Sequence, residues 1–129
     1  MTGHGLGGSL DAYASQALRR GGATWSIDVE PGAEDGREAL LYSIGRELLS
    51  NAGKHASATH VRLRLSRDEA TIRLVVEDDG IGFAEDGAEA PGHFGLLTTR
   101  RRVAATGGQM TISRTGAGAR SDVELPVAR

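Results

Sequence analysis

The chain has 129 residues, enough for one domain with a two-layer core but too few for two independent domains. Its 15 Lys and Arg residues against 17 Asp and Glu residues give a formal net charge of -2, so no overall positive field favours binding to nucleic acid or to anionic lipid. Cysteine is absent, which excludes disulfides, thiolate metal sites and thiol nucleophiles and fits a cytoplasmic location.

The first half of the chain predicts two helices with a strand between them. Residues 9–20 predict a helix that is capped by Ser9 and stopped by the glycine pair 21–22. Residues 23–29 alternate apolar and polar, which is typical of a half-buried strand. Residues 36–56 predict the longest helix, since an apolar stripe recurs there at helical spacing. We expect residues 1–22 to be a leader and N-terminal helix at a domain or linker edge, and residues 23–129 to form the domain.

The second half predicts two hairpins separated by a loop and a helix. Residues 78–93 combine glycines and acids with almost no apolar periodicity, so they predict a long functional loop or lid. A helix over 94–105 follows. Because the strands arrive mostly as hairpins, the sequence predicts an α/β (α+β) two-layer sandwich, a mixed, mostly antiparallel sheet with helices on one face. The hairpin strands are 59–65, 70–77, 109–113 and 121–127.

One face of the long helix collects an acid, an amide and two bases. Glu47, Asn51, Lys54 and His55 follow one another at spacings of four, three and one, so they share a side of the helix. Such a set could ligate a hard cation, contact phosphate and orient a nucleophile. The alternative is an ordinary solvated helix face.

A carboxylate followed by two glycines ends the strand before the lid. Asp78 in this position can accept a hydrogen bond from an exocyclic amine such as that of adenine, while Gly80 and Gly82 allow backbone to approach a ligand. An ordinary Asp-Gly turn is the alternative. The segment lacks the third glycine and the immediate helix of the dinucleotide fingerprint, and no Walker A pattern occurs in the chain.

The end of the lid provides a third candidate. Gly92, Gly95 and Leu96 lie where the lid gives way to a helix, whose free N-terminal backbone donors could receive phosphate oxygens. The arginine run 100–102 on the same helix is typical of solvated surface.

In this order, the three segments resemble the sequence boxes of bacterial sensor histidine kinases. Residues 46–56 resemble the N box, residues 78–83 the first glycine box and residues 92–96 the second. The similarity runs from about Trp25 to the end and is greatest to the nitrate-sensor-like branch of this GHKL superfamily. It implies the Bergerat ATP-binding fold, with ATP held between the helices and the lid.

The resemblance also implies roles for the candidate residues. Asn51 would ligate the Mg²⁺ that bridges the phosphates, and Glu47 would act as acid or base near the attacking imidazole. Asp78 would bind the adenine amine, and the lid residues would form the hinge and the phosphate-facing helix start. The implied ATP-binding residues are Asn51, Lys54, His55, Asp78, Gly80, Gly82, Gly92, Gly95 and Leu96.

The implied activity is transfer of the γ-phosphate of Mg-ATP to a histidine in two-component signalling. Residues 9–20 contain no histidine, so we expect the phosphoacceptor on a dimerisation domain outside this chain and no autophosphorylation by the isolated domain. The expected partners are that domain and a response regulator, without direct contact to nucleic acid. No apolar run approaches the roughly 20 residues of a membrane helix, so membrane attachment would come only through other parts of a longer sensor. The alternatives are a serine kinase that regulates a sigma factor and a non-catalytic ATP-binding module.

Three residues depart from the family pattern. Gly53 stands where a larger apolar residue is more common; it costs the helix roughly 1 kcal/mol relative to Ala and predicts a looser site. Asp79 replaces a common Asn and adds a charge whose effect the sequence leaves open. Ala119 stands where the family commonly has Thr, which removes a hydroxyl that could hold phosphate or order the turn.

Overall fold

The structure is a computed structural model that describes residues 5–55, 59–80, 94–115 and 118–127. Within these ranges the chain forms three helices, a short 3-10 turn and five strands. The helical elements are α1 (Gly5–Leu18), the turn η1 (Arg19–Gly21), α2 (Glu38–His55) and α3 (Phe94–Ala105). The strands are β1 (Thr24–Val29), β2 (His60–Arg67), β3 (Thr71–Asp78), β4 (Gln109–Thr115) and β5 (Gly118–Pro126).

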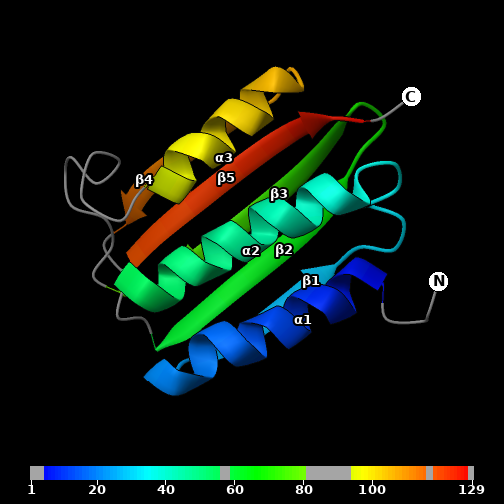
Figure 1. Cartoon of the computed structure of the whole chain (residues 1–129). Helices are drawn as coiled ribbons and strands as arrows, with labels where there is room; N and C mark the ends of the chain where they lie inside the picture. The colour runs from blue at the N-terminus through cyan, green and yellow to red at the C-terminus, as the bar shows by residue number, and fades with distance from the viewer. Residues whose placement is uncertain (1–4, 56–58, 81–93, 116–117, 128–129) are drawn as a thin grey trace.

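The strands form one sheet in the order β1-β2-β3-β5-β4, and the three helices cover one of its faces (Figure 1). β1 and β2 run parallel because α2 crosses over between them, whereas the other neighbours are antiparallel. The predicted mixed, mostly antiparallel two-layer fold is therefore confirmed. Along the described part of the chain, no helix is long and apolar enough to cross a membrane.

The core lies between the helix layer and the sheet. Alternate side chains of β2 and β3 point into it, and the predicted apolar stripe of α2 covers them. These core residues are almost fully buried, and they include Leu41, Ile44, Leu49, Val61, Leu63, Leu65, Ile72 and Leu74. The 2-residue and 3.6-residue periodicities of the sequence thus place the same residues inside as the structure does.

The first helix begins earlier than predicted. α1 starts at Gly5, so Ser9 is an interior residue whose hydroxyl donates to the Gly5 carbonyl oxygen at 3.1 Å rather than a cap. The reason is burial, because Leu6 adds one more turn to the apolar stripe and is 6% exposed. α1 ends at Leu18, two residues before the predicted end, and the 3-10 turn η1 continues it to Gly21. Gly22, in the left-handed conformation at φ 77°, then ends the helical segment at the predicted glycine pair. α1 packs on α2 and β1, while the domain boundary at residue 22 stays a prediction.

Two glycines of α2 let α1 approach closely. A Cβ at Gly45 would lie 2.9 Å from Leu10 Cδ2, and one at Gly53 would lie 2.9 Å from Leu18 Cδ2 and 3.0 Å from the Ala17 carbonyl oxygen. Gly53 therefore has a packing role against α1 that the sequence did not reveal.

Gly108, directly before β4, is a third glycine at a close backbone approach, and it can be tested by substitution. A Cβ at Gly108 would lie 2.2 Å from the Glu124 carbonyl oxygen, which is backbone and cannot turn away. We expect Gly108→Ala to lower the free energy of unfolding by about 1–3 kcal/mol, measured by urea denaturation. Gly21→Ala is the control, since no heavy atom lies within 4 Å of a Cβ there. Equal effects of the two substitutions would contradict the packing account.

Candidate functional site

The predicted site residues come from segments that meet at one end of the molecule. The last turns of α2, the end of β3, the start of β5 and the first turn of α3 all lie at this end (left in Figure 1). β3 and β5 are joined there by the register, which pairs Asp78 with Ala119. The topology therefore brings the candidate residues of α2 and the carboxylate at the end of β3 to the same end of the molecule.

Asn51 is buried, with 4% of its surface exposed, so it does not lie on a solvated helix face. Its amide nitrogen donates to the backbone carbonyl oxygen of Glu47 and to Glu47 Oε2, both at 2.9 Å. Glu47 is half-buried. Because both hydrogen bonds use the amide nitrogen, the carbonyl oxygen Oδ1 is the atom with which Asn51 can bind a cation.

Asp78 is the last residue of β3 and is half-buried. Burial raises the pKa of its carboxyl above the ordinary value, and the neighbouring charge of Asp79 acts in the same direction. The backbone N–H groups of Gly80 and Ala119 oppose this rise by donating to the carboxylate, with Gly80 N lying 2.9 Å from Oδ1. The hydrogen bond from Gly80 N–H thus closes a local turn after Asp78 and helps to hold the carboxylate in place.

Gly118 is a site residue that sequence reasoning missed. A Cβ there would lie 1.8 Å from the Asp78 carbonyl oxygen and 2.9 Å from Asp79 Cα, and the φ of 153° also favours glycine. The backbone of β5 can lie against the end of β3 only because this residue has no side chain. The available signal was a glycine shortly before the predicted strand 121–127, two residues after another glycine in the sequence. Ala119, with its missing hydroxyl, stands next to it and opposite Asp78.

The sequence left the effect of the Asp79 charge open. In the structure, the carboxylate of Asp79 is directed toward Thr59 and His60 at the start of β2. Its Oδ1 accepts the backbone N–H groups of Thr59 at 2.8 Å and His60 at 2.9 Å, and its Oδ2 accepts the Thr59 hydroxyl. These hydrogen bonds, led by the one from the Thr59 hydroxyl, lower the pKa of Asp79 to about 2. Asp79 therefore stays ionised and is directed at the start of β2.

Several predicted residues fall outside what the structure describes. Gly82 and Gly92 lie beyond the described ranges. Lys54 and His55 belong to the last turn of α2, and Gly95 and Leu96 to the first turn of α3, but their side chains are likewise outside the description. Of the arginine run, Arg102 is exposed and also donates to the Ser43 hydroxyl, which ties α3 to α2.

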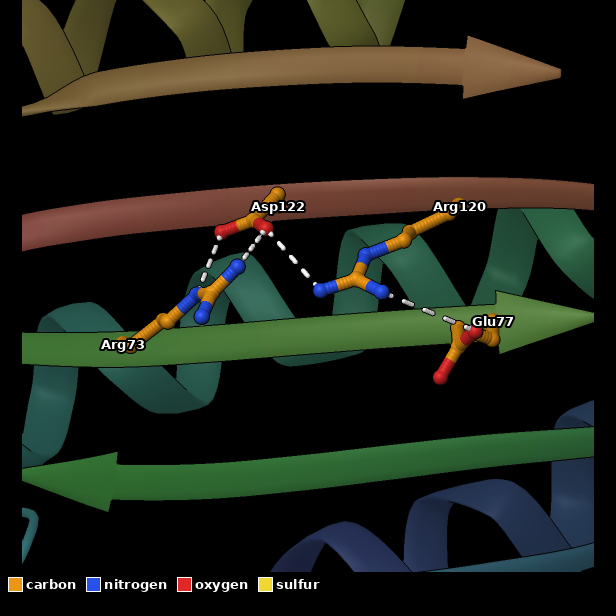
Figure 2. Close-up of polar contacts among 4 residues, drawn as sticks. All are labelled: Arg73, Glu77, Arg120 and Asp122. Carbon is orange, nitrogen blue, oxygen red and sulfur yellow. Dashed lines mark hydrogen bonds and ion pairs between the residues drawn. The ribbon is translucent and has the colours of Figure 1, made fainter.

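The uncovered face of the sheet carries a separate charged network (Figure 2). Asp122 accepts hydrogen bonds from Arg73 and from Arg120, and Arg120 Nη1 lies 4.0 Å from Glu77 Oε2. The hydrogen bonds from Arg73 are the main cause that lowers the pKa of Asp122. The helices lie behind the sheet in this view, so the network is not part of the candidate site.

Comparison with known proteins gives a family match and curated relatives. Residues 36–129 match the family described as histidine kinase-, DNA gyrase B-, and HSP90-like ATPase. The chain is 34% identical over 128 residues to the sensor histidine kinase NarS of Mycobacterium tuberculosis, which covers 97% of this chain and 30% of NarS. It is 28% identical over 121 residues to the nitrate/nitrite sensor protein NarX of Escherichia coli, covering 92% of this chain and 20% of NarX. The chain thus spans less than a third of the length of these relatives.

A solved structure gives the same picture for the fold. The histidine kinase domain of a blue-light activated histidine kinase from Erythrobacter litoralis superposes with a TM-score of 0.74 at 25% identity, covering 95% of this chain and 61% of that chain. The expected Bergerat fold is confirmed by this match.

The raised pKa of Asp78 predicts how stability depends on pH. Folding disfavours the ionised carboxyl, so Asp78 destabilises the domain above its raised folded pKa and has no such effect below the ordinary value of 3.8. We expect nucleotide-free Asp78→Asn to unfold at a higher temperature than the wild type near neutral pH, with a gain that shrinks as the pH falls toward the ordinary pKa. Thermal unfolding followed by circular dichroism measures this.

Asp68 supplies the control of opposite sign. The backbone N–H groups of Ala70 and Thr71 donate to its carboxylate and lower its pKa, so its charge stabilises the fold above the ordinary pKa and this effect is lost as the pH falls. Asp68→Asn should therefore lower the unfolding temperature near neutral pH. A change of the same sign in both variants would refute the assignment of burial as the cause at Asp78.

Proposed function

The chain belongs to the histidine kinase-, DNA gyrase B-, and HSP90-like ATPase family, and from this membership we propose that it is the ATP-binding catalytic domain of a two-component sensor histidine kinase. In this proposal the domain binds Mg-ATP and transfers the γ-phosphate to a histidine on a dimerisation domain outside this chain. The observation that carries it is the buried Asn51, hydrogen-bonded to Glu47, on a helix that ends at the same end of the molecule as the half-buried Asp78.

Recognition of the base is assigned to Asp78. A carboxylate that is held by backbone N–H groups and partly removed from water forms a strong hydrogen bond with an amine donor. The exocyclic amine of adenine is such a donor. Gly80 donates its backbone N–H to this carboxylate, and Gly118, which has no Cβ, lets the backbone of β5 lie against the Asp78 backbone.

Recognition of the phosphates is assigned to the helix face and the lid. Mg²⁺ prefers oxygen ligands and commonly combines one or two protein oxygens with substrate phosphates. The carbonyl oxygen of Asn51 fits this chemistry, and among the described residues no group of three or more His, Cys, Asp or Glu side chains could hold a metal alone. Bound Mg²⁺ would neutralise phosphate charge during transfer. Lys54 and His55 are assigned to phosphate contacts, and Gly92, Gly95 and Leu96 to the lid hinge and the phosphate-facing start of the helix. Gly82 is assigned, with Gly80, to the adenine pocket.

Glu47 is assigned the role of acid or base toward the attacking imidazole. Its Oε2 holds the Asn51 amide, so one carboxylate both orients the cation ligand and lies next to it. Because the nucleophile arrives on another domain, what the chain itself supplies is positioning and charge stabilisation.

The partners and the location follow from the proposed activity. We assign a response regulator as the final acceptor of the phosphoryl group and a cytoplasmic position to the domain, as part of a longer sensor. The serine-kinase alternative is not favoured, since the relatives are named sensor histidine kinases and a nitrate/nitrite sensor.

Asn51→Ala tests the phosphate side. We expect Mg-dependent transfer to an added phosphoacceptor hairpin to fall by about 100-fold or more, because the cation loses its protein oxygen and Glu47 loses its partner. Transfer is measured as acid-labile, base-stable phosphate on the hairpin, and circular dichroism checks folding. Ser50→Ala, one position along the same helix, is the control and should transfer normally. Unchanged Mg-ATP turnover in Asn51→Ala, or acid-stable phosphate in the wild type, would contradict the proposal.

Asp78→Asn tests the base side. We expect ATP affinity to fall by about 10- to 150-fold, the equivalent of one hydrogen bond to a charged group. A purine riboside triphosphate, which lacks the exocyclic amine, should lose much less. Calorimetric titration of both nucleotides with Mg²⁺ measures the difference, and equal losses would remove the adenine assignment.

A further inference from the structure

Asp79 connects the end of β3 to the start of β2, at the end of the sheet where Asp78 lies. Its carboxylate accepts backbone N–H groups from Thr59 and His60 as well as the Thr59 hydroxyl. In return, Asp79 N donates to the His60 carbonyl oxygen at 3.3 Å. Regular register ends at the pair Val61 and Asp78, so Asp79 extends the contact between β2 and β3 by a side chain where the ladder stops.

The same contacts reach β1. Thr24 N donates to the Thr59 carbonyl oxygen at 2.9 Å, and Thr24 Oγ1 lies 2.8 Å from His60 Nδ1. A continuous chain of hydrogen bonds therefore runs from β1 through the start of β2 to Asp79. Asp79 is exposed, so these bonds are formed by a residue that contributes nothing to the core.

Asp78, the last residue of β3, precedes Asp79 directly, so one rigid peptide unit joins the two residues. A peptide that is fixed at Asp79 therefore fixes the direction of the Asp78 side chain as well. On the other side, the backbone of Gly118 lies so close to Asp78 that no Cβ fits between them. The Asp78 backbone is thus held from β2 through Asp79 and from β5 through Gly118.

We propose that Asp79 is a positioning residue for recognition of the adenine amine: it clamps the end of β3 to the start of β2 and so aims the carboxylate of Asp78. The inference rests on the proposed function, because it requires that Asp78 binds the base. Asp79 itself does not contact the nucleotide in this proposal, since both of its oxygens are engaged by β2.

Asp68 offers a matched control at the opposite end of the same hairpin. It is also exposed, and its Oδ1 accepts two backbone N–H groups, those of Ala70 at 2.9 Å and Thr71 at 2.8 Å. Replacing Asp68 or Asp79 by Ala removes the same kind of interaction, a carboxylate that caps a strand end. Only Asp79 lies beside Asp78. A general loss of hairpin stability would therefore affect both variants, whereas a misplaced Asp78 carboxylate would affect Asp79→Ala alone.

The experiment compares ATP with purine riboside triphosphate on the 129-residue chain by calorimetric titration with Mg²⁺. Both nucleotides carry the same triphosphate, so removing the charge of Asp79 changes both affinities alike and cancels in their ratio. We expect Asp79→Ala to reduce the wild-type preference for ATP by about fivefold or more, as for a misdirected charged hydrogen bond. Asp68→Ala should keep the wild-type preference.

Two further variants separate the positioning of the Asp78 carboxylate from the charge of Asp79 and from a folding defect. Asp79→Asn keeps an oxygen for the two backbone N–H groups and should retain most of the preference for ATP. Thr59→Ala removes only the hydroxyl bond and should reduce the preference partly, which keeps the test decisive if Asp79→Ala does not fold.

The outcomes distinguish this inference from the function on which it rests. A wild type that binds both nucleotides equally would remove the adenine assignment and the positioning role together. A wild type that prefers ATP, with the same preference in Asp79→Ala and Thr59→Ala, would overturn the positioning role alone. An equal loss in Asp68→Ala would overturn it as well, because the effect would then be one of hairpin stability.

Discussion

A carboxylate that is partly withdrawn from water must be surrounded by donors or it protonates, and Asp78 imposes this constraint on the end of β3. Its neighbours meet the requirement with backbone, since the N–H groups of Gly80 and Ala119 both favour its charged form. The backbone of β5 lies directly against the backbone of Asp78, and a Cβ at Gly118 would be 1.8 Å from the Asp78 carbonyl oxygen. The missing side chain at Gly118 thus lets β5 pack against the backbone that carries this carboxylate.

The helix layer has to be placed just as closely, because α2 carries Asn51 over the same end of the sheet. Its position is set by packing on both sides: the apolar stripe lies on β2 and β3, and the small residues Gly45 and Gly53 receive side chains of α1. A glycine in the middle of a helix costs about 1 kcal/mol of intrinsic propensity. The close contact with Leu10 and Leu18 offsets this cost through burial, as both are almost fully buried.

The sequence predicted the elements and the order of the layers, because periodicities of 2 and 3.6 residues report burial directly. It could not predict which polar side chains of α2 would be buried. Asn51 shares its helix face with charged residues, and only the tertiary placement of α2 removes it from water while Glu47 satisfies its amide. The direction of Asp79 was equally hidden, since its partners Thr59 and His60 come from a strand 19 to 20 residues earlier.

At the start of α1, a local signal in the sequence predicted the wrong boundary. Ser9 has the chemistry of a helix cap, and a local interpretation stops the helix there. The apolar contact that Leu6 makes with the core outweighs that preference and draws the glycine-rich segment after Gly5 into the helix. Local signals are thus reliable where burial agrees with them and fail where a single buried side chain adds another turn.

Burial works against the charge of Asp78, and the proposed recognition of adenine requires that charge. Burial disfavours the ionised carboxyl, so an uncharged amide at this position would cost the fold less. A donor that arrives with the nucleotide would favour the charged form and offset the cost. Any ligand that binds only the folded state also stabilises it by mass action. If Asp78 binds the base as proposed, the nucleotide therefore stabilises the fold both by mass action and by favouring the charged carboxyl.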